Sequence, residues 1–337
     1  MSRKSRDPFA ELAPETAEEE APESDERPTE QAPDEPPPVL GIGLHPGISE
    51  AHYHADPCER PSLSASCAHT IVTKSEAHAY DEHPRLGSSG KRRHTKEMDF
   101  GSLVHLLTLG GQAEIVEVSA DDWKKKADQA TRKAARAAGR IPVLSRELER
   151  AHRLVDKIAQ AYPLCPGLRE VTLVWEQPVP ESFLRSGETL AAPVLCRGRL
   201  DHLDLAEDHT SAVVTDLKIW NSAETSDLER ALVDYGADIQ AEAYSSAICL
   251  LFPETQGRVA FIDLVVEEST GYVNPCGYGG SMAELGGLRW GRGVYTWARC
   301  RDSNHWPAYA TPGRLTYPQP KPWALSREQE LSYGTRI

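Results

Sequence analysis

Apolar and polar positions alternate most clearly in residues 196–220, where a polar turn joins two apolar segments. This alternation is typical of β-strands, whose successive side chains point to opposite faces of a sheet. In the second strand, Asp216 and Lys218 are predicted on the same face as Val214. Two consecutive strands can form a hairpin, which would bring Asp201 of the first strand close to Asp216 and Lys218 at one end of a sheet.

Other parts of the chain carry helical patterns. Apolar residues at three- and four-residue spacing predict helices over residues 61–72, 98–111, 145–158, 238–252 and, as a short helix, from 293. Ser62 or Ser64 is the expected N-cap of the first helix, and Ser145 that of the third. Gly110 and Gly111 are expected to end the second helix.

Strand patterns recur over residues 171–179 and 258–268, on either side of the predicted hairpin. Strands bounded by helices on both sides indicate an α/β (α+β) fold, with a mixed central β-sheet flanked by helices. Beyond the short helix at 293, a segment rich in Pro and Trp is expected to extend along the core.

Composition divides the chain of 337 residues, which is 39% apolar and carries a net charge of −14. Residues 1–38 hold twelve acidic against four basic residues and eight prolines, so we expect a disordered acidic tail. A folded domain is expected over residues 39–325 and a C-terminal tail over residues 326–337.

Neither a membrane span nor a secretory signal is found. The seven cysteines lack a C-x-x-C pair, which favours a reducing, cytoplasmic location.

Two basic segments stand out against this acidic background. Lys91, Arg92 and Arg93 lie in a glycine-containing loop, and residues 123–140 contain seven basic residues and one acidic residue. A basic stripe at helical spacing suits the phosphates of DNA, whereas a solvated helix face is an equally good interpretation. The candidate DNA-binding residues of the second segment are Lys124, Lys125, Lys126, Arg132, Lys133, Arg136 and Arg140.

The chemistry of the hairpin points to a metal. Two carboxylates provide oxygen ligands for Mg²⁺ or Mn²⁺, and a nearby lysine can hold and polarise a water, as phosphodiester hydrolysis requires. Asp204 is the alternative to Asp201, and Glu170 and Glu176 are lesser candidates for an extra acid. An acid and a lysine two residues apart can equally be a solvated strand edge or a surface ion pair.

Four short motifs follow one another in the chain, GSLVH (101–105), RLD (199–201), VTDLK (214–218) and QAEAY (240–244). In this order they resemble the PD-(D/E)xK nuclease superfamily, specifically its RecB-like branch. Within the branch the chain is most similar to RecE (exonuclease VIII)-type phage and prophage exonucleases, over residues 41 to 325. The chain departs from that pattern in two ways. Ile219 and Trp220 follow the lysine where the family commonly has Thr, and a later strand ends in VVEES (265–269) in place of the more usual ending with a lysine. Both departures bear on the substrate contacts beside the site.

The resemblance implies a restriction-endonuclease-like core, assigned to residues 39–325, and a Mg²⁺-dependent deoxyribonuclease. By this resemblance Lys218 orients the attacking water, and Gln240 and Tyr244 hold the DNA strand or Lys218. The metal ligands that it implies are His105, Asp201, Asp216 and the Leu217 carbonyl.

The same resemblance implies a function in phage-type homologous recombination. Such enzymes digest linear duplex DNA from an end in the 5′-to-3′ direction, leave a 3′ overhang for a single-strand annealing recombinase, and form homo-oligomeric rings. Two alternatives stay open at this point. One is an endonuclease or a defence-system nuclease of the same superfamily, and the other is a catalytically idle DNA-binding scaffold.

Overall fold

The computed structural model describes residues 38–87, 96–110, 113–190, 192–310 and 313–334. Within these residues six strands form one sheet in the order β1-β4-β5-β6-β7-β8, and β2 pairs with β3 in a second sheet. In the larger sheet β6 and β7 are parallel and the other neighbours antiparallel. The strands are β1 (Gly43–His45), β2 (Ile115–Val118), β3 (Ile141–Leu144), β4 (Leu168–Gln177), β5 (Val194–Leu205), β6 (Ala212–Trp220), β7 (Val259–Glu267) and β8 (Val273–Gly277).

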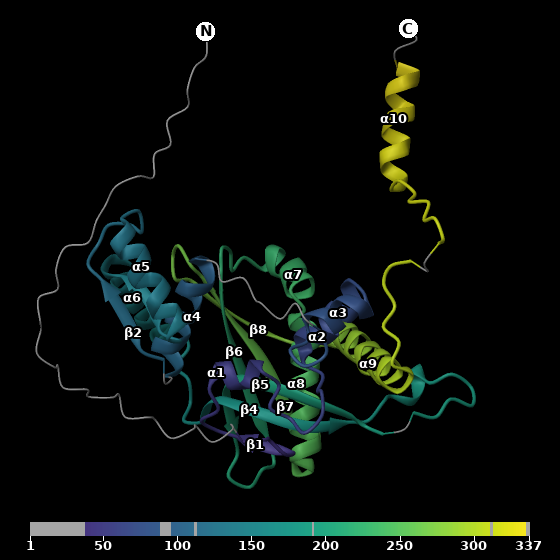
Figure 1. The fold of residues 1–337 in the computed structure, drawn as a ribbon, viewed down its shortest axis with the longest axis horizontal. Coiled ribbons are helices and arrows are strands. Elements are labelled where there is room, and N and C mark those ends of the chain that lie inside the picture. Colours follow the sequence, from purple (N-terminus) through teal and green to yellow (C-terminus); the bar gives the residue numbers. More distant parts are fainter. Residues whose placement is uncertain (1–37, 88–95, 111–112, 191, 311–312, 335–337) are drawn as a thin grey trace, which may run out of the picture. The chain divides into compact units, whose positions relative to one another are not determined.

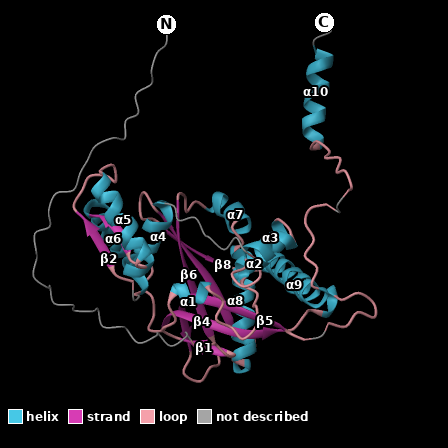
Figure 2. Cartoon of the chain, in the orientation of Figure 1, coloured by secondary structure: helices cyan, strands magenta, loops and turns pink. Residues whose placement is uncertain are grey.

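Helices flank the larger sheet (Figures 1 and 2), which confirms the predicted α/β (α+β) fold with a mixed central sheet. The helices are α1 (Glu50–His54), α2 (Ala65–Thr73), α3 (Glu76–Glu82), α4 (Lys96–Leu109), α5 (Lys126–Ala137), α6 (Ser145–Ala161), α7 (Thr225–Asp234), α8 (Ala237–Leu251), α9 (Gly280–Ser303) and α10 (Pro322–Gly334). In the described part of the chain, no helix is both long enough and apolar enough to cross a bilayer.

The two faces of the larger sheet bury different apolar clusters. On one face Leu217 and Leu264 pack with Leu103 of α4 and Ile158 of α6. On the other face, Val214 packs in the cluster formed with α2, α8 and α9. Because side chains alternate along a strand, Asp216 and Lys218 share the second face with Val214, as the sequence predicts.

Several helix ends follow from local sequence. The Ser64 hydroxyl accepts from the Cys67 backbone N–H at 3.2 Å, so Ser64 is the N-cap of α2. Gly110, with φ of 74°, ends α4 as predicted. The cap predicted for α6 was wrong. Because β3 runs directly into this helix, Ser145 is its first residue and the preceding Leu144 is the N-cap.

The C-terminal part is more helical than the sequence pattern indicates. Helix α9 spans 24 residues and begins well before the predicted start at 293. Helix α10 begins at Pro322, so the boundary predicted between residues 325 and 326 falls inside this helix. Nearly all of the predicted acidic tail, residues 1–38, lies outside the described residues.

Candidate active site

The candidate site lies where β5 and β6 separate. Pairing between these two strands covers His202–Leu205 and Ala212–Thr215. The last pair joins His202 to Thr215. Asp201 precedes His202 in the chain and Asp216 follows Thr215, so both aspartates lie just beyond the paired region. The backbone N–H of Leu217 donates a 2.7 Å hydrogen bond to Asp201 Oδ2. This hydrogen bond replaces the one that a paired strand would give to the Leu217 N–H, and it fixes the Asp201 carboxylate. We call the place where β5 and β6 separate the strand fork.

Lys218 and Gln240 both bind Asp216. Lys218 Nζ donates to Asp216 Oδ2 and, at 2.9 Å, to Gln240 Oε1. Gln240 Nε2 donates to Asp216 Oδ1 at 2.6 Å, which closes a triangle between β6 and α8. Burial disfavours the lysine charge, but the attraction of Asp216 and Asp263 outweighs it and raises the pKa of Lys218 above its ordinary value. Lys218 is therefore a charged donor held in one orientation.

Three further side chains form the group best placed for a cation. One ligand atom from each of His105, Glu170 and Asp201 lies within 4.8 Å of the others. His105 Nδ1 of α4 is 3.4 Å from Asp201 Oδ2. Glu170 lies opposite Asp201, because Arg169 pairs with His202 on one side and Val171 with Leu200 on the other.

Glu170 occupies an unusual backbone position and has a strong partner. Its φ of 51° lies in the left-handed region, which is costly for a residue with a side chain. Arg199 binds its carboxylate with Nε at 2.8 Å and Nη2 at 2.6 Å. Arg199 Nη1 also donates to the Ile48 carbonyl at 2.6 Å, so the arginine links Glu170 to the N-terminal part of the domain.

The electrostatics of this group fit a divalent cation. Burial raises the pKa of Asp201 to about 7 from an ordinary 3.8, and repulsion from Asp216 adds to the rise while His105 opposes it. A bound cation would relieve that repulsion. Two carboxylate oxygens with one imidazole form a donor set that such ions accept. The residues present therefore fit a divalent metal ion.

The predicted metal ligands are only partly brought together. His105 and Asp201 lie in the group, whereas both oxygens of Asp216 are engaged by Lys218 and Gln240. The Leu217 N–H binds Asp201, and a ligand role for the Leu217 carbonyl stays a prediction.

The other candidate acids separate clearly in the structure. Glu170, a lesser candidate in the sequence, belongs to the group. Glu176 forms an ion pair of 2.9 Å with Arg60 instead. Asp204 lies in the paired part of β5, opposite Val213.

Sequence reasoning missed Asp263 and Tyr278. Asp263 lies beside Asp216 in the parallel ladder of β6 and β7, and its side chain is fully buried. Its Oδ1 is 3.8 Å from Lys218 Nζ, and the Tyr278 hydroxyl donates to its Oδ2. Burial raises the pKa of Asp263 to about 6, although the Lys218 charge opposes this rise. An acid in the otherwise apolar strand VAFIDLVV was the available signal.

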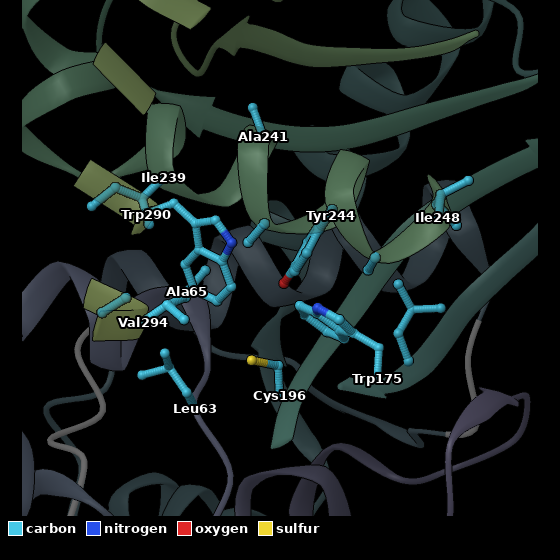
Figure 3. Close-up of a cluster of buried hydrophobic side chains, with 14 of the residues drawn as sticks. Leu63, Ala65, Trp175, Cys196, Ile239, Ala241, Tyr244, Ile248, Trp290 and Val294 are labelled. Carbon is cyan, nitrogen blue, oxygen red and sulfur yellow. The ribbon is translucent and has the colours of Figure 1, made fainter. Parts of the chain in front are cut away.

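Tyr244, one turn after Gln240, does not join the Lys218 group. Its ring lies in the apolar core near Trp175 (Figure 3) and is 6% exposed. Its hydroxyl accepts from the Arg199 backbone N–H at 3.3 Å. A Cβ atom at Gly198 would come within 2.5 Å of the Tyr244 ring, so this position of β5 requires glycine. Tyr244 therefore positions β5 next to Asp201.

Most of the second basic segment lies on or beside α5. Lys124 pairs with Asp122 at 2.8 Å, and the guanidinium of Arg132 lies 5.0 Å from the Trp123 ring centroid. Arg140 lies beyond the end of the helix at Ala137 and pairs with Glu114, so it is not part of the predicted helical stripe. The other candidates of this segment are Lys125, Lys126, Lys133 and Arg136. The candidates Lys91, Arg92 and Arg93 lie outside the described residues.

The fold and site together define a class of protein. A mixed sheet that places carboxylates and a charged lysine at a strand fork fits a metal-assisted hydrolase. The family model of the PD-(D/E)XK nuclease superfamily matches residues 62–275, well over half of the chain. The chain belongs to this superfamily.

A solved structure supports the same fold. It is a protein from Eubacterium rectale, provisionally named an exonuclease, and it superposes with a TM-score of 0.51 at 12% sequence identity. The superposition covers 83% of this chain and 97% of the other. At this identity the likeness establishes the fold alone. No curated protein sequence matches the chain.

Proposed function

We propose that this chain is a Mg²⁺-dependent DNA exonuclease of the RecE type. Its substrate is linear duplex DNA, from which it removes the 5′-terminated strand and leaves a 3′ overhang. The observation that carries the proposal is the position of the His105, Glu170 and Asp201 group at the strand fork that also holds the Lys218–Asp216 pair. This arrangement combines a cation site with a fixed ammonium donor, and phosphodiester hydrolysis needs both.

Each residue has a distinct chemical role. Asp201, Glu170 and His105 would hold the ion, which would neutralise negative charge on the phosphate. Lys218 has one N–H left beside those that bind Asp216 and Gln240, and this N–H orients the attacking water, while the positive charge stabilises the negative charge that develops on the phosphate. Asp216 and Gln240 keep the ammonium in place, because each of them binds it or its partner directly. Mn²⁺, which also prefers oxygen ligands, is the expected substitute.

The basic residues on and around α5 would bind the DNA backbone. Lys125, Lys126 and Lys133 are exposed, and phosphate contacts of this kind do not depend on sequence. Lys91, Arg92 and Arg93 belong to the same proposal on the basis of the sequence. We further propose a cytoplasmic protein that acts in phage-type recombination as a homo-oligomeric ring. A single-strand annealing recombinase would receive its product.

The test compares end-labelled linear duplex with a covalently closed circle of the same sequence, in Mg²⁺ and in EDTA. The proposal expects metal-dependent loss of the linear DNA alone, with the label released first from the 5′ end. Cutting of the circle would replace it with an endonuclease, and release from the 3′ end would reverse the polarity. Absence of cleavage in Mg²⁺ and in Mn²⁺ would leave a DNA-binding scaffold.

A further inference from the structure

An aromatic pair lies immediately beyond Lys218 on β6. Trp220 ends this strand, and the alternation of side chains places it on the same face as Asp216 and Lys218. Its ring contacts that of Tyr235, with centroids 5.4 Å apart and an interplanar angle of 53°. We call these two residues the Trp220–Tyr235 pair.

The two members of the pair are exposed to different degrees. Trp220 is half-buried and packs against the cluster that includes Leu228 and Leu232 of α7. Its carbonyl accepts from the Glu268 N–H at 2.8 Å, which fixes the end of the strand. Tyr235, by contrast, is 72% exposed. The pair is thus an anchored ring that supports a second, exposed ring.

Both residues are close in the chain to residues of the candidate site. Trp220 follows Lys218 by two positions, and Tyr235 precedes Gln240 by five. Two residues of strand span about 6.6 Å. Stacked nucleotides rise by about 3.4 Å each, so Trp220 is about two nucleotides from a phosphate at Lys218, and the Tyr235 ring lies next to that of Trp220.

We propose that the Trp220–Tyr235 pair is a stacking site for an unpaired nucleobase of the DNA strand being cleaved, next to the scissile phosphate. The inference rests on the proposed function and adds to it a contact with a base. An aromatic ring stacks on every base, so the contact is independent of sequence, as digestion of arbitrary DNA requires. The unpaired base can come from a single strand or from an opened duplex end.

Binding in EDTA tests the stacking site without cleavage. The probes are a single-stranded oligonucleotide and a duplex with terminal mismatches, each with 2-aminopurine at its end, whose fluorescence falls when the base stacks. Tyr235→Ala should weaken binding about tenfold and abolish the quenching, because one stacked base is lost. Tyr235→Phe keeps the ring and should behave as the native protein does. If Tyr235→Ala loses affinity and quenching with the single strand alone, the base comes from a single strand. If both probes lose them, an opened duplex end also supplies the base. Either result supports the proposal.

The matched control is Tyr309→Ala. Tyr309 is 73% exposed and also contacts an aromatic ring, that of His78, but it does not neighbour Lys218. Native quenching and affinity in Tyr235→Ala would overturn the inference, and so would an equal loss in Tyr309→Ala. Digestion of linear DNA by the native protein is measured separately. Quenching that depends on Tyr235 without any digestion would refute the nuclease and keep the base site, whereas digestion with unchanged Tyr235→Ala binding would refute the base site alone.

Discussion

The backbone N–H of Leu217 donates a hydrogen bond to the side chain of Asp201, across the gap that opens between β5 and β6. This bond joins the two strands that carry the candidate catalytic acids, at the point where strand pairing has ended. Asp201 is thereby placed close to His105 and Glu170. Strand separation leaves the Leu217 N–H without a partner on β5, and the Asp201 carboxylate accepts from it instead. The hydrogen bond fixes this carboxylate, whose negative charge burial disfavours.

Asp201→Asn should abolish stabilisation by Mg²⁺ without loss of the fold. The asparagine oxygen can still accept from Leu217, but the negative charge that attracts the cation is gone. In the native protein, Mg²⁺ at a hundred times its dissociation constant should add about 2.7 kcal/mol to the free energy of unfolding. Thermal unfolding with and without Mg²⁺ measures this. Asp204→Asn, on the same strand but outside the group, is the control and should keep the full Mg²⁺ effect.

Asp201 should also make metal-free stability depend on pH. Its pKa in the folded protein, about 7, lies above the ordinary 3.8, so the folded state holds the proton more tightly than the unfolded state. This contribution is therefore favourable at low pH and is lost as the pH rises from about 4 to about 7. Burial lowers the pKa of His83 to about 4, which gives the opposite slope in the same window.

The measurement is urea unfolding in EDTA at several pH values, for the native protein and for Asp201→Asn. Because His83 is present in both proteins, their difference isolates Asp201. The variant should gain stability relative to the native protein as the pH rises to 7. A constant difference across this window would show that Asp201 is already ionised in the metal-free fold.

The sequence predicts those parts of the site that depend on neighbours in the chain. Asp216 and Lys218 share a face because strand side chains alternate, and Gln240 reaches them from a helix whose apolar spacing is clear. Glu170 depends instead on the register of β4 against β5, which a long connection separates, and on a positive φ that no residue pattern reveals. Asp263 reaches the site through a parallel pairing made after two intervening helices. Such non-local contacts are set by packing of the whole sheet.

Asp263→Asn should slow DNA cleavage about tenfold or more while DNA binding changes little. The substitution removes a buried negative charge 3.8 Å from Lys218 Nζ, which changes the orientation and the charge balance of the lysine. A tenfold loss of rate corresponds to an increase of about 1.4 kcal/mol in the activation free energy. Single-turnover digestion of linear duplex measures the rate. Asp238→Asn is the control, because Asp238 is equally buried but pairs with Arg289. If both variants lose stability and only Asp263→Asn loses rate, the effect is specific to the Lys218 environment.

Gln240→Leu should reduce the cleavage rate and leave the helix intact. Leucine fills a similar volume but leaves one Asp216 oxygen and one Lys218 donor without their partner. A buried polar group without a partner costs about 1–3 kcal/mol, so we expect a rate loss of one to two orders of magnitude if Lys218 reorients. Gln240→Glu keeps an acceptor for Lys218 but replaces the donor to Asp216 with a second carboxylate oxygen, so it should also lose rate. Equal activity of all three proteins would contradict a role for Gln240 in holding Lys218.

Gly198→Ala should destabilise the fold through Tyr244. The added methyl would lie 2.5 Å from the Tyr244 ring, and forcing extra volume into a packed core costs about 1–3 kcal/mol. Tyr244→Leu removes the ring atoms that clash, so the double variant should lose less stability than the sum of the single variants. Urea unfolding of the four proteins gives the coupling energy. Additive losses would contradict a direct clash between a side chain at position 198 and the Tyr244 ring.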